Sequence, residues 1–196
     1  ICESNAKHLA DKFDCAFSTN LENVLNNQYF DLISVCSPDD THYDIVKYIL
    51  CSRNRPKVIF LEKPAFKSIA EYDEIKKLAF QEDVLIVVNH SRRFNRFFSD
   101  FRDFIKSQKF GNLIKINTVY YNGWFHNGSH IIDTISLLTS DQIDLSSLVS
   151  VIELSESNND HTLEFVGALK KSHVPIYISA INQRYYQLFD FDFWFE

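Results

Sequence analysis

A lysine at the end of an apolar run is the residue of this sequence best suited to chemistry. The run Val58–Leu61 is followed by Glu62 and Lys63, and Pro64 then stops the extended pattern. Ligands of open α/β sheets bind beyond the carboxyl ends of the strands, so this lysine is aimed at a site. An amine whose pKa is lowered by burial or by a nearby positive ring can exchange protons at neutral pH. We predict that Lys63 is catalytic; the structural alternative is an exposed Glu62–Lys63 ion pair.

Polar residues also follow an earlier apolar run, at 30–37. Ser37 and Pro38 end this run, and His42 lies where a helix is expected to begin. A proline fixes the backbone at the sheet edge, and the side chains between Pro38 and His42 can cap the helix. A strand, a turn and a helix cap explain this segment without any function, apart from His42. For His42 the alternative is a surface position in the first turn.

Glu3 is a further candidate, because we expect it at the end of a strand. An acidic residue at the end of the second strand of a dinucleotide-binding unit accepts hydrogen bonds from the adenosine ribose and disfavours a 2′-phosphate. On this basis NAD is the expected cofactor and NADP the alternative. The competing interpretation is a solvated surface carboxylate.

The segment 120–133 combines two glycines with aromatic and polar side chains. His130 and Asp133 are three residues apart, close to one helical face, so the carboxylate can orient the imidazole or a neighbouring group. His126 and His130 have a spacing that metal sites use, but no acidic ligand lies between them and no third histidine is near. We therefore predict proton transfer or sugar binding here and no metal.

The elements that position these residues change in pattern near Arg93. Before it, apolar runs alternate with helical patterns, which predicts successive β-α units and a parallel sheet. The expected helices are 5–13, 21–26, 42–51 and 69–79, and the expected strands are 15–17, 30–37, 58–61 and 84–89. After it, we expect helices at 94–108 and 130–138 and strands at 113–121, 149–154, 162–169 and 175–181.

The predicted fold class is therefore α/β, with two domains. A doubly wound parallel-sheet (Rossmann) domain covers 1–93, and an α+β domain with a large, mostly antiparallel sheet covers 94–196. The chain starts within an apparent strand and has no methionine, so we expect that segments are missing at both ends.

Composition narrows the functional classes. The 196 residues carry a formal charge of -6, which argues against a nucleic-acid partner. The apolar runs are too short to cross a bilayer and no leader is recognisable, so we predict a cytoplasmic protein without membrane contact. The four cysteines form no C-x-x-C motif. We expect reduced thiols in or near the core, with neither zinc site nor disulfide framework.

Taken together, these segments resemble the glucose-fructose oxidoreductase, inositol dehydrogenase and MocA (Gfo/Idh/MocA) family of NAD(P)-dependent oxidoreductases. The resemblance rests on the order of the motifs. A strand ends in Ser-Pro-x-x-x-His, the next ends in Glu-Lys-Pro, Arg-Arg follows a third strand, and a Gly-x-His-x-x-Asp element comes later. The Gly-x-Gly-x-x-Gly loop of the family has no counterpart, since no glycine precedes Gly111.

The resemblance implies a hydride transfer between nicotinamide and a hydroxyl or carbonyl of a sugar, sugar nucleotide or cyclitol. Lys63 would be an acid/base residue beside the nicotinamide, with Glu62 near the cofactor ribose and Pro64 shaping the turn. Ser37, Pro38 and His42 would belong to the same cofactor site. His130 matches the family's later histidine. Relatives similar to inositol dehydrogenase have an aspartate four residues before that histidine, where this chain has His126.

The resemblance also implies contacts to substrate. Asn127 is expected to bind a substrate hydroxyl and Tyr121 a sugar face, alongside His126 and Asp133. Arg92 or Arg93 would bind a phosphate or carboxylate, and the alternative for both is an ordinary surface charge. Family members commonly form homodimers or homotetramers through the sheet of the second domain, and we expect the same here. The alternative function is a sensor or regulator that binds nucleotide or sugar without catalysis.

Overall fold

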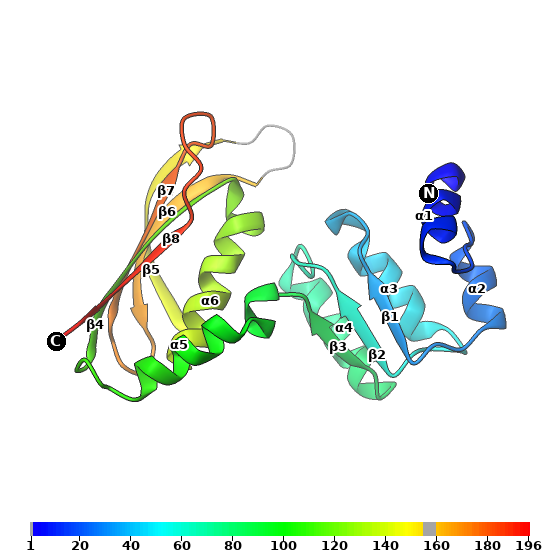
Figure 1. Ribbon diagram of the computed structural model, residues 1–196, viewed down its shortest axis with the longest axis horizontal. Coiled ribbons are helices and arrows are strands. Elements are labelled where there is room, and N and C mark those ends of the chain that lie inside the picture. Colours follow the sequence, from blue (N-terminus) through cyan, green and yellow to red (C-terminus); the bar gives the residue numbers. More distant parts are fainter. Residues whose placement is uncertain (1, 155–159) are drawn as a thin grey trace. The chain divides into compact units, whose positions relative to one another are not determined.

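The computed structural model describes residues 2–154 and 160–196, and the chain forms two compact units, Ile1–Asn89 and His90–Glu196. Each unit has its own sheet and its own hydrophobic core. Figure 1 labels the helices and strands of both units. None of the helices in the described part of the chain combines the length and the apolar character needed to traverse a bilayer.

The first unit contains a three-stranded parallel sheet in the order β1-β2-β3. Its elements are α1 (Glu3–Phe13), α2 (Leu21–Asn27), β1 (Leu32–Val35), the short 3-10 helix η1 (Asp39–Thr41), α3 (His42–Cys51), β2 (Val58–Leu61), α4 (Ile69–Gln81) and β3 (Leu85–Val88). Helix α3 connects β1 to β2 and α4 connects β2 to β3, as parallel pairing requires. The two helices contact each other beside the sheet (Figure 1).

The core of the first unit explains why these segments adopt their structures. Val46, Ile49 and Leu50 are spaced by three and four residues, so they lie on one face of α3, and all are fully buried. Ile59 and Leu61 of the central strand β2 are also fully buried. Burying one such side chain stabilises the fold by about 1.5–3 kcal/mol, so this face holds α3 against β2.

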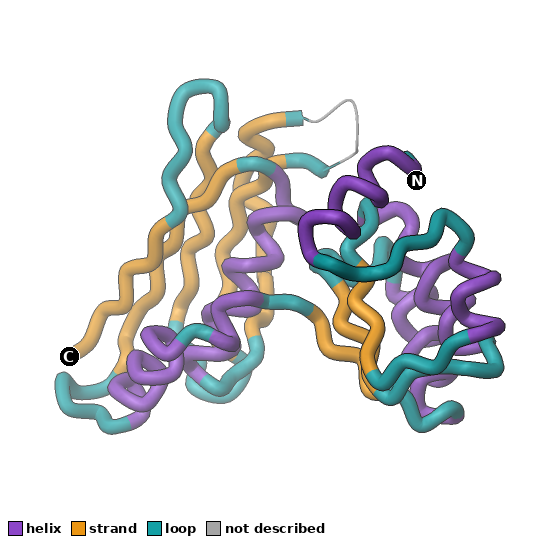
Figure 2. Tube along the Cα trace, turned by 45° about the vertical axis from the view of Figure 1, so that its right-hand side comes forward, coloured by secondary structure: helices purple, strands orange, loops and turns teal. Residues whose placement is uncertain are grey.

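The second unit contains a mixed, mostly antiparallel five-stranded sheet in the order β5-β6-β7-β4-β8, in which only β4 and β7 are parallel within the described residues. Its elements are η2 (Ser91–Phe94), α5 (Arg96–Lys106), β4 (Leu113–Tyr121), the π-helical segment η3 (Gly123–Gly128), α6 (Ser129–Thr139), β5 (Ile143–Glu153), β6 (Thr162–Leu169), β7 (Pro175–Ile181) and β8 (Asp190–Phe195). The helices α5 and α6 lie beside this sheet (Figures 1 and 2).

A buried tyrosine anchors the core of the second unit. Tyr120 of β4 packs with Ile135 of α6 and Ile178 of β7, and all three are at most 1% exposed. The Tyr120 hydroxyl donates to the main-chain oxygen of Leu163 over 2.6 Å and accepts from the main-chain N–H of Leu163 over 2.9 Å. This residue therefore fixes the end of β4 to the start of β6, next to η3.

The predicted fold class is confirmed for both sheets, and five segments have the predicted bounds. These are α3, β2, β4, β6 and β7. The strand expected at 15–17 is wrong, because these residues form an exposed connection between α1 and α2. Three residues of apolar character are too few to distinguish a strand from a loop. The strand expected at 149–154 is the second half of a longer one, β5, whose first half is rich in polar residues.

Glu3 and the cysteines also differ from expectation. Glu3 does not end a strand; it is the first residue of α1, and Cys2 before it is extended. All four cysteines have free thiols and are exposed, so the prediction of core or near-core positions is wrong. Cys2, Cys36 and Cys51 lie at or next to the ends of α1, β1 and α3.

Candidate functional site

The loops that follow β1 and β2 are joined by one buried histidine. His42, the first residue of α3, is 1% exposed. Its Nε2 lies 2.9 Å from the main-chain oxygen of Ser37, and its Nδ1 lies 3.0 Å from that of Pro64. The Thr41 hydroxyl oxygen lies 2.7 Å from the Ser37 hydroxyl oxygen and 2.7 Å from the main-chain oxygen of Pro38, so its single O–H joins this turn. The Ser-Pro-x-x-x-His motif is therefore a structural unit.

The partners of His42 define what this side chain can do. Both are carbonyl oxygens, which only accept hydrogen bonds. A neutral ring has one N–H and bonds one of them; a protonated ring bonds both. With both ring nitrogens directed at main-chain oxygens and its side chain buried, His42 connects the two loops. Its place in a cofactor site stays a prediction.

Glu62 and Lys63 continue the line of β2 beyond its carboxyl end. The N–H of Glu62 donates to the main-chain oxygen of Val35 over 3.0 Å, and its carboxylate accepts from the Asn89 amide over 2.6 Å. The carboxylate of Glu62 is thereby oriented from the end of β3. Lys63 is partly buried and precedes Pro64 through a cis peptide bond. The central strand of the parallel sheet thus presents an oriented carboxylate followed by an amine, the arrangement predicted from the sequence.

A second group of polar side chains surrounds Asp133 in the second unit. The side chain of Asp133 is 11% exposed; its Oδ1 accepts from Arg93 Nε over 2.7 Å, and its Oδ2 lies 3.7 Å from His90 Nδ1. The rings of His90 and His130 meet edge to face with centroids 6.0 Å apart, and His130 makes a similar contact with Phe189 at 6.5 Å. The structure therefore brings together Arg93, His130 and Asp133, all predicted substrate-site residues, and adds His90.

The neighbouring arginine has a different environment. The guanidinium of Arg92 lies 4.5 Å from the ring centroid of Phe189 and 5.9 Å from that of Phe98. Burial lowers the pKa of Arg92, and the charge of Asp133 opposes this shift. Arg92 forms no salt bridge within 4.0 Å among the described residues, in contrast to Arg93. The sequence left open which arginine would bind an anion, and the choice between Arg92 and Arg93 stays a prediction.

The remaining predicted substrate residues lie in or beside η3. Tyr121 ends β4, and His126 and Asn127 lie within η3; all three are partly buried. The Nδ1 of His126 lies 2.6 Å from Oδ2 of Asp160. Asp160 was not predicted, and the sequence holds no local signal for it, because it is 34 positions away from His126. The wide helical turn of η3 was not predicted either.

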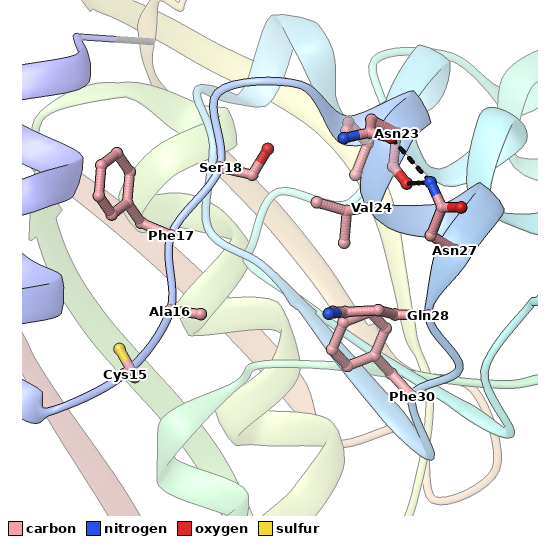
Figure 3. Close-up of a pocket in the computed structure, with 10 residues that line it drawn as sticks. Cys15, Ala16, Phe17, Ser18, Asn23, Val24, Asn27, Gln28 and Phe30 are labelled. Carbon is pink, nitrogen blue, oxygen red and sulfur yellow. Dashed lines mark hydrogen bonds between the residues drawn. The ribbon is translucent and has the colours of Figure 1, made fainter.

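One cavity of the first unit is lined by none of these residues. It has a volume of about 820 Å³ and lies between the connection after α1 and helix α2 (Figure 3). Phe17, Leu21, Val24 and Phe30 give it a largely apolar wall. None of its lining residues belongs to the predicted site, so we attribute no part of the expected chemistry to it.

The first unit has the architecture of a dinucleotide-binding domain: a parallel sheet, helical crossovers and polar loops at the carboxyl ends of the strands. Residues 2–90 match the family model described as "Oxidoreductase family, NAD-binding Rossmann fold". The first unit therefore matches the NAD-binding Rossmann domain of the Gfo/Idh/MocA oxidoreductases, and the resemblance seen in the sequence is confirmed.

Relatives of known name support this assignment. The scyllo-inositol 2-dehydrogenase (NADP(+)) IolW of Bacillus subtilis is 25% identical over 166 residues, which cover 74% of this chain and 44% of the relative. The myo-inositol 2-dehydrogenase of Thermotoga maritima is 30% identical over 88 residues, 45% of this chain and 25% of that enzyme. The chain therefore matches less than half the length of these relatives.

The fold of both units recurs among solved structures. That of an NAD-binding protein from Listeria innocua superimposes with a TM-score of 0.81 and 14% identity, covering 100% of this chain and 61% of the other. At this identity the likeness concerns the fold alone. The second unit, which lies beyond the family match at 2–90, thus has the same architecture as the corresponding part of that protein.

Proposed function

We propose that this chain is part of an NAD(P)-dependent dehydrogenase that oxidises a hydroxyl, or reduces the corresponding carbonyl, of a sugar, sugar nucleotide or cyclitol. The observation that carries the proposal is Lys63 at the carboxyl end of β2, the central strand of the parallel sheet, where ligands of such sheets bind. The names of the two inositol dehydrogenases that resemble this chain support the substrate class.

The residues present fit one part of a nicotinamide dinucleotide. Glu62 is oriented by Asn89 and can accept hydrogen bonds from a ribose, and the loop of Ser37 and Pro38 is held in shape by His42. Glu3 is exposed at the start of α1, directly after the extended Cys2, and its carboxylate is the proposed partner of a ribose hydroxyl. We propose NAD as the cofactor because of Glu3, with NADP as the alternative that the name of IolW supports.

In the proposed reaction the chain supplies binding groups and proton transfer. The bound cofactor supplies the acceptor for the hydride that leaves the carbinol carbon. Lys63 accepts the proton of the same carbinol, so that its O–H bond breaks, an N–H bond forms and the product is a carbonyl. His130 is the proposed second acid/base group. The contact between Asp133 and His90, whose ring meets that of His130, supports an ordered position for His130.

Substrate recognition is proposed for the residues around Asp133 and in η3. Arg93 is already paired with Asp133, so the pair offers a fixed hydrogen-bonding surface rather than an isolated positive charge. Asn127 offers an amide to a hydroxyl, and Tyr121 a ring to a sugar face. Each of these groups suits a polyhydroxylated ligand better than an apolar one.

We also propose that the sheet of the second unit forms a homodimer or homotetramer interface. Tyr177 of β7 and Trp194 of β8 are 45% and 53% exposed, and their neighbours in sequence point to the core. The Lys115 amine lies 4.7 Å and 5.9 Å from the centroids of these two rings. Exposed aromatic rings on a sheet face that α5 and α6 leave uncovered support self-association.

The proposal is tested by replacing the lysine in the complete protein. Lys63→Ala should lower kcat by about 10²–10⁴-fold for whichever inositol or sugar the protein oxidises, followed as NAD(P)H absorbance. Cofactor binding, measured by calorimetry, should stay close to that of the unchanged protein. Lys77→Ala is the matched control, because Lys77 is an exposed lysine of α4.

Two results would count against this function. A near-normal kcat in Lys63→Ala would remove the lysine from the mechanism. Binding of NAD(P) and of a sugar by the unchanged protein, with no NAD(P)H formed from any sugar or cyclitol tested, would instead support the sensor or regulator.

A further inference from the structure

Asp160 makes an unusually complete set of contacts with η3. It is 7% exposed and directly precedes the segment that leads into β6. Its Oδ1 accepts from the main-chain N–H of Phe125 over 2.6 Å, and its Oδ2 accepts from the main-chain N–H of His126 over 3.1 Å. The same Oδ2 lies 2.6 Å from Nδ1 of the His126 ring. One carboxylate thus binds both the backbone and the imidazole of His126.

The surrounding backbone is shaped so that the carboxylate can approach this closely. Gly123 has a φ of +82°, and a Cβ at that position would lie 2.0 Å from Asp160 Oδ2. Gly123 N–H donates to the hydroxyl of Thr162 over 3.0 Å, and Trp124 N–H donates to the main-chain oxygen of His161 over 2.9 Å. These hydrogen bonds from Gly123 and Trp124 to residues 161 and 162 hold the neighbouring Asp160 against η3.

The contact between Asp160 and the His126 ring is not needed to attach Asp160 to the backbone of η3. The two main-chain N–H groups already satisfy both carboxylate oxygens. The side chain of His126 is 38% exposed, whereas that of Asp160 is 5% exposed. Part of the imidazole therefore reaches solvent while its Nδ1 is held from the buried side. A histidine held in this way has a defined orientation and a defined tautomer.

The chemistry of the pair fixes that tautomer. An ionised carboxylate only accepts hydrogen bonds, so Nδ1 of His126 carries the proton that it donates to Asp160. In the neutral ring the lone pair then lies on Nε2. A hydroxyl of a ligand can donate a hydrogen bond to this nitrogen.

We propose that Asp160 is a positioning residue that holds His126 in the Nδ1–H tautomer, so that Nε2 accepts a hydrogen bond from a hydroxyl of a sugar or cyclitol. The contact with a sugar or cyclitol hydroxyl rests on the proposed dehydrogenase function. The tautomer of His126 does not depend on that function. His126 occupies the position where inositol-dehydrogenase-like sequences carry an aspartate, and Asp160 supplies the carboxylate from another element.

The tautomer is measured first, because it needs no turnover. In protein labelled with ¹⁵N and ¹³C at histidine, the two neutral tautomers differ in their ring nitrogen and Cδ2 shifts, and His126→Gln identifies the signals by their loss. We expect the Nδ1–H tautomer in the unchanged protein. Asp160→Asn should convert His126 to the Nε2–H tautomer, because the amide can offer an N–H to Nδ1. Asp144→Asn, at an exposed position of β5, should leave it unchanged.

Activity is measured second. His126→Gln should lower kcat by about 10²-fold, and Asp160→Asn should lower kcat in the same direction with a smaller change in KM. An Nε2–H tautomer in the unchanged protein, or one that Asp160→Asn does not alter, would overturn the positioning role even if Asp160→Asn folds poorly. The expected tautomer with an unaltered kcat in His126→Gln would overturn the role towards the hydroxyl. If the unchanged protein shows no turnover at all, the dehydrogenase proposal fails in the Lys63 experiment, independently of the His126 tautomer.

Discussion

Replacing His42 by leucine tests whether this residue connects the two loops at the strand ends. Leucine has a similar size and can occupy the buried position at the start of α3, but it carries no N–H. The main-chain oxygens of Ser37 and Pro64, 2.9 Å and 3.0 Å from the ring nitrogens, would lose their partner. Because the His42 side chain is 1% exposed, water cannot take over these contacts without opening the structure.

The expected loss of stability follows from the number of carbonyl groups left without a donor. A buried polar group without a partner costs about 1–3 kcal/mol. One such group results if the ring is neutral and two if it is protonated. The leucine side chain offsets part of this cost through its own burial. We therefore expect His42→Leu to lower the free energy of unfolding of the first unit by about 2 kcal/mol, with most of the effect near the two loops.

The assay must follow the first unit by itself. Urea unfolding by circular dichroism gives the overall stability, and hydrogen exchange by mass spectrometry reports on peptides that contain Ser37 and Pro64. Both tryptophans, Trp124 and Trp194, belong to the second unit, so their fluorescence follows that unit. His8→Leu is the control, since His8 is exposed on α1. Equal stability of the two variants, within about 0.5 kcal/mol, together with unaltered exchange in both loops, would refute this account.

Two further predictions concern the second unit. Tyr120→Phe leaves both main-chain groups of Leu163 without their buried partner, so the free energy of unfolding should fall by about 2–4 kcal/mol in tryptophan-monitored urea unfolding; a fall below about 0.5 kcal/mol would contradict the role of its hydroxyl. Burial acts to raise the pKa of Asp141, but hydrogen bonds from the N–H groups of Ser172 and Gln142 outweigh it and lower the pKa. Asp141 should therefore stabilise the fold above the unfolded pKa of about 3.9, and this contribution is lost as the pH falls through the lower folded pKa. Asp141→Asn should reduce the slope of stability against pH below about pH 4, and an unchanged slope would contradict the argument.

The sequence was sufficient wherever burial imposed a periodic pattern. Helix α3 and strands β2 and β4 have the predicted bounds, because helix α3 shows one buried face and each strand shows a short apolar or alternating run. The strand expected at 15–17 failed because its apolar residues contribute to a surface connection. The first half of β5 was missed because strand pairing with β6, and not its own hydrophobicity, holds it in place.

The candidate site was predictable in its motifs but not in its contacts. Lys63, Glu62 and His130 follow from their positions after strands or at a helix start. The hydrogen bond from Asn89 to Glu62 spans 27 positions, and that between His126 and Asp160 spans 34. Such pairs depend on how separate elements pack, and no spacing rule within one helix or strand reveals them.

His42 and His126 show why the partner of a histidine matters more than its position in a motif. Each begins or lies within a helical segment and was predicted to belong to a ligand site. The ring nitrogens of His42 are both directed at carbonyl oxygens, in a site 1% exposed, so a change in its protonation alters the number of bonds it makes to the fold. His126 has a carboxylate at Nδ1 and a side chain 38% exposed, so its ring is held from the buried side and is partly open to solvent. The first arrangement favours a scaffold, and the second favours contact with a ligand.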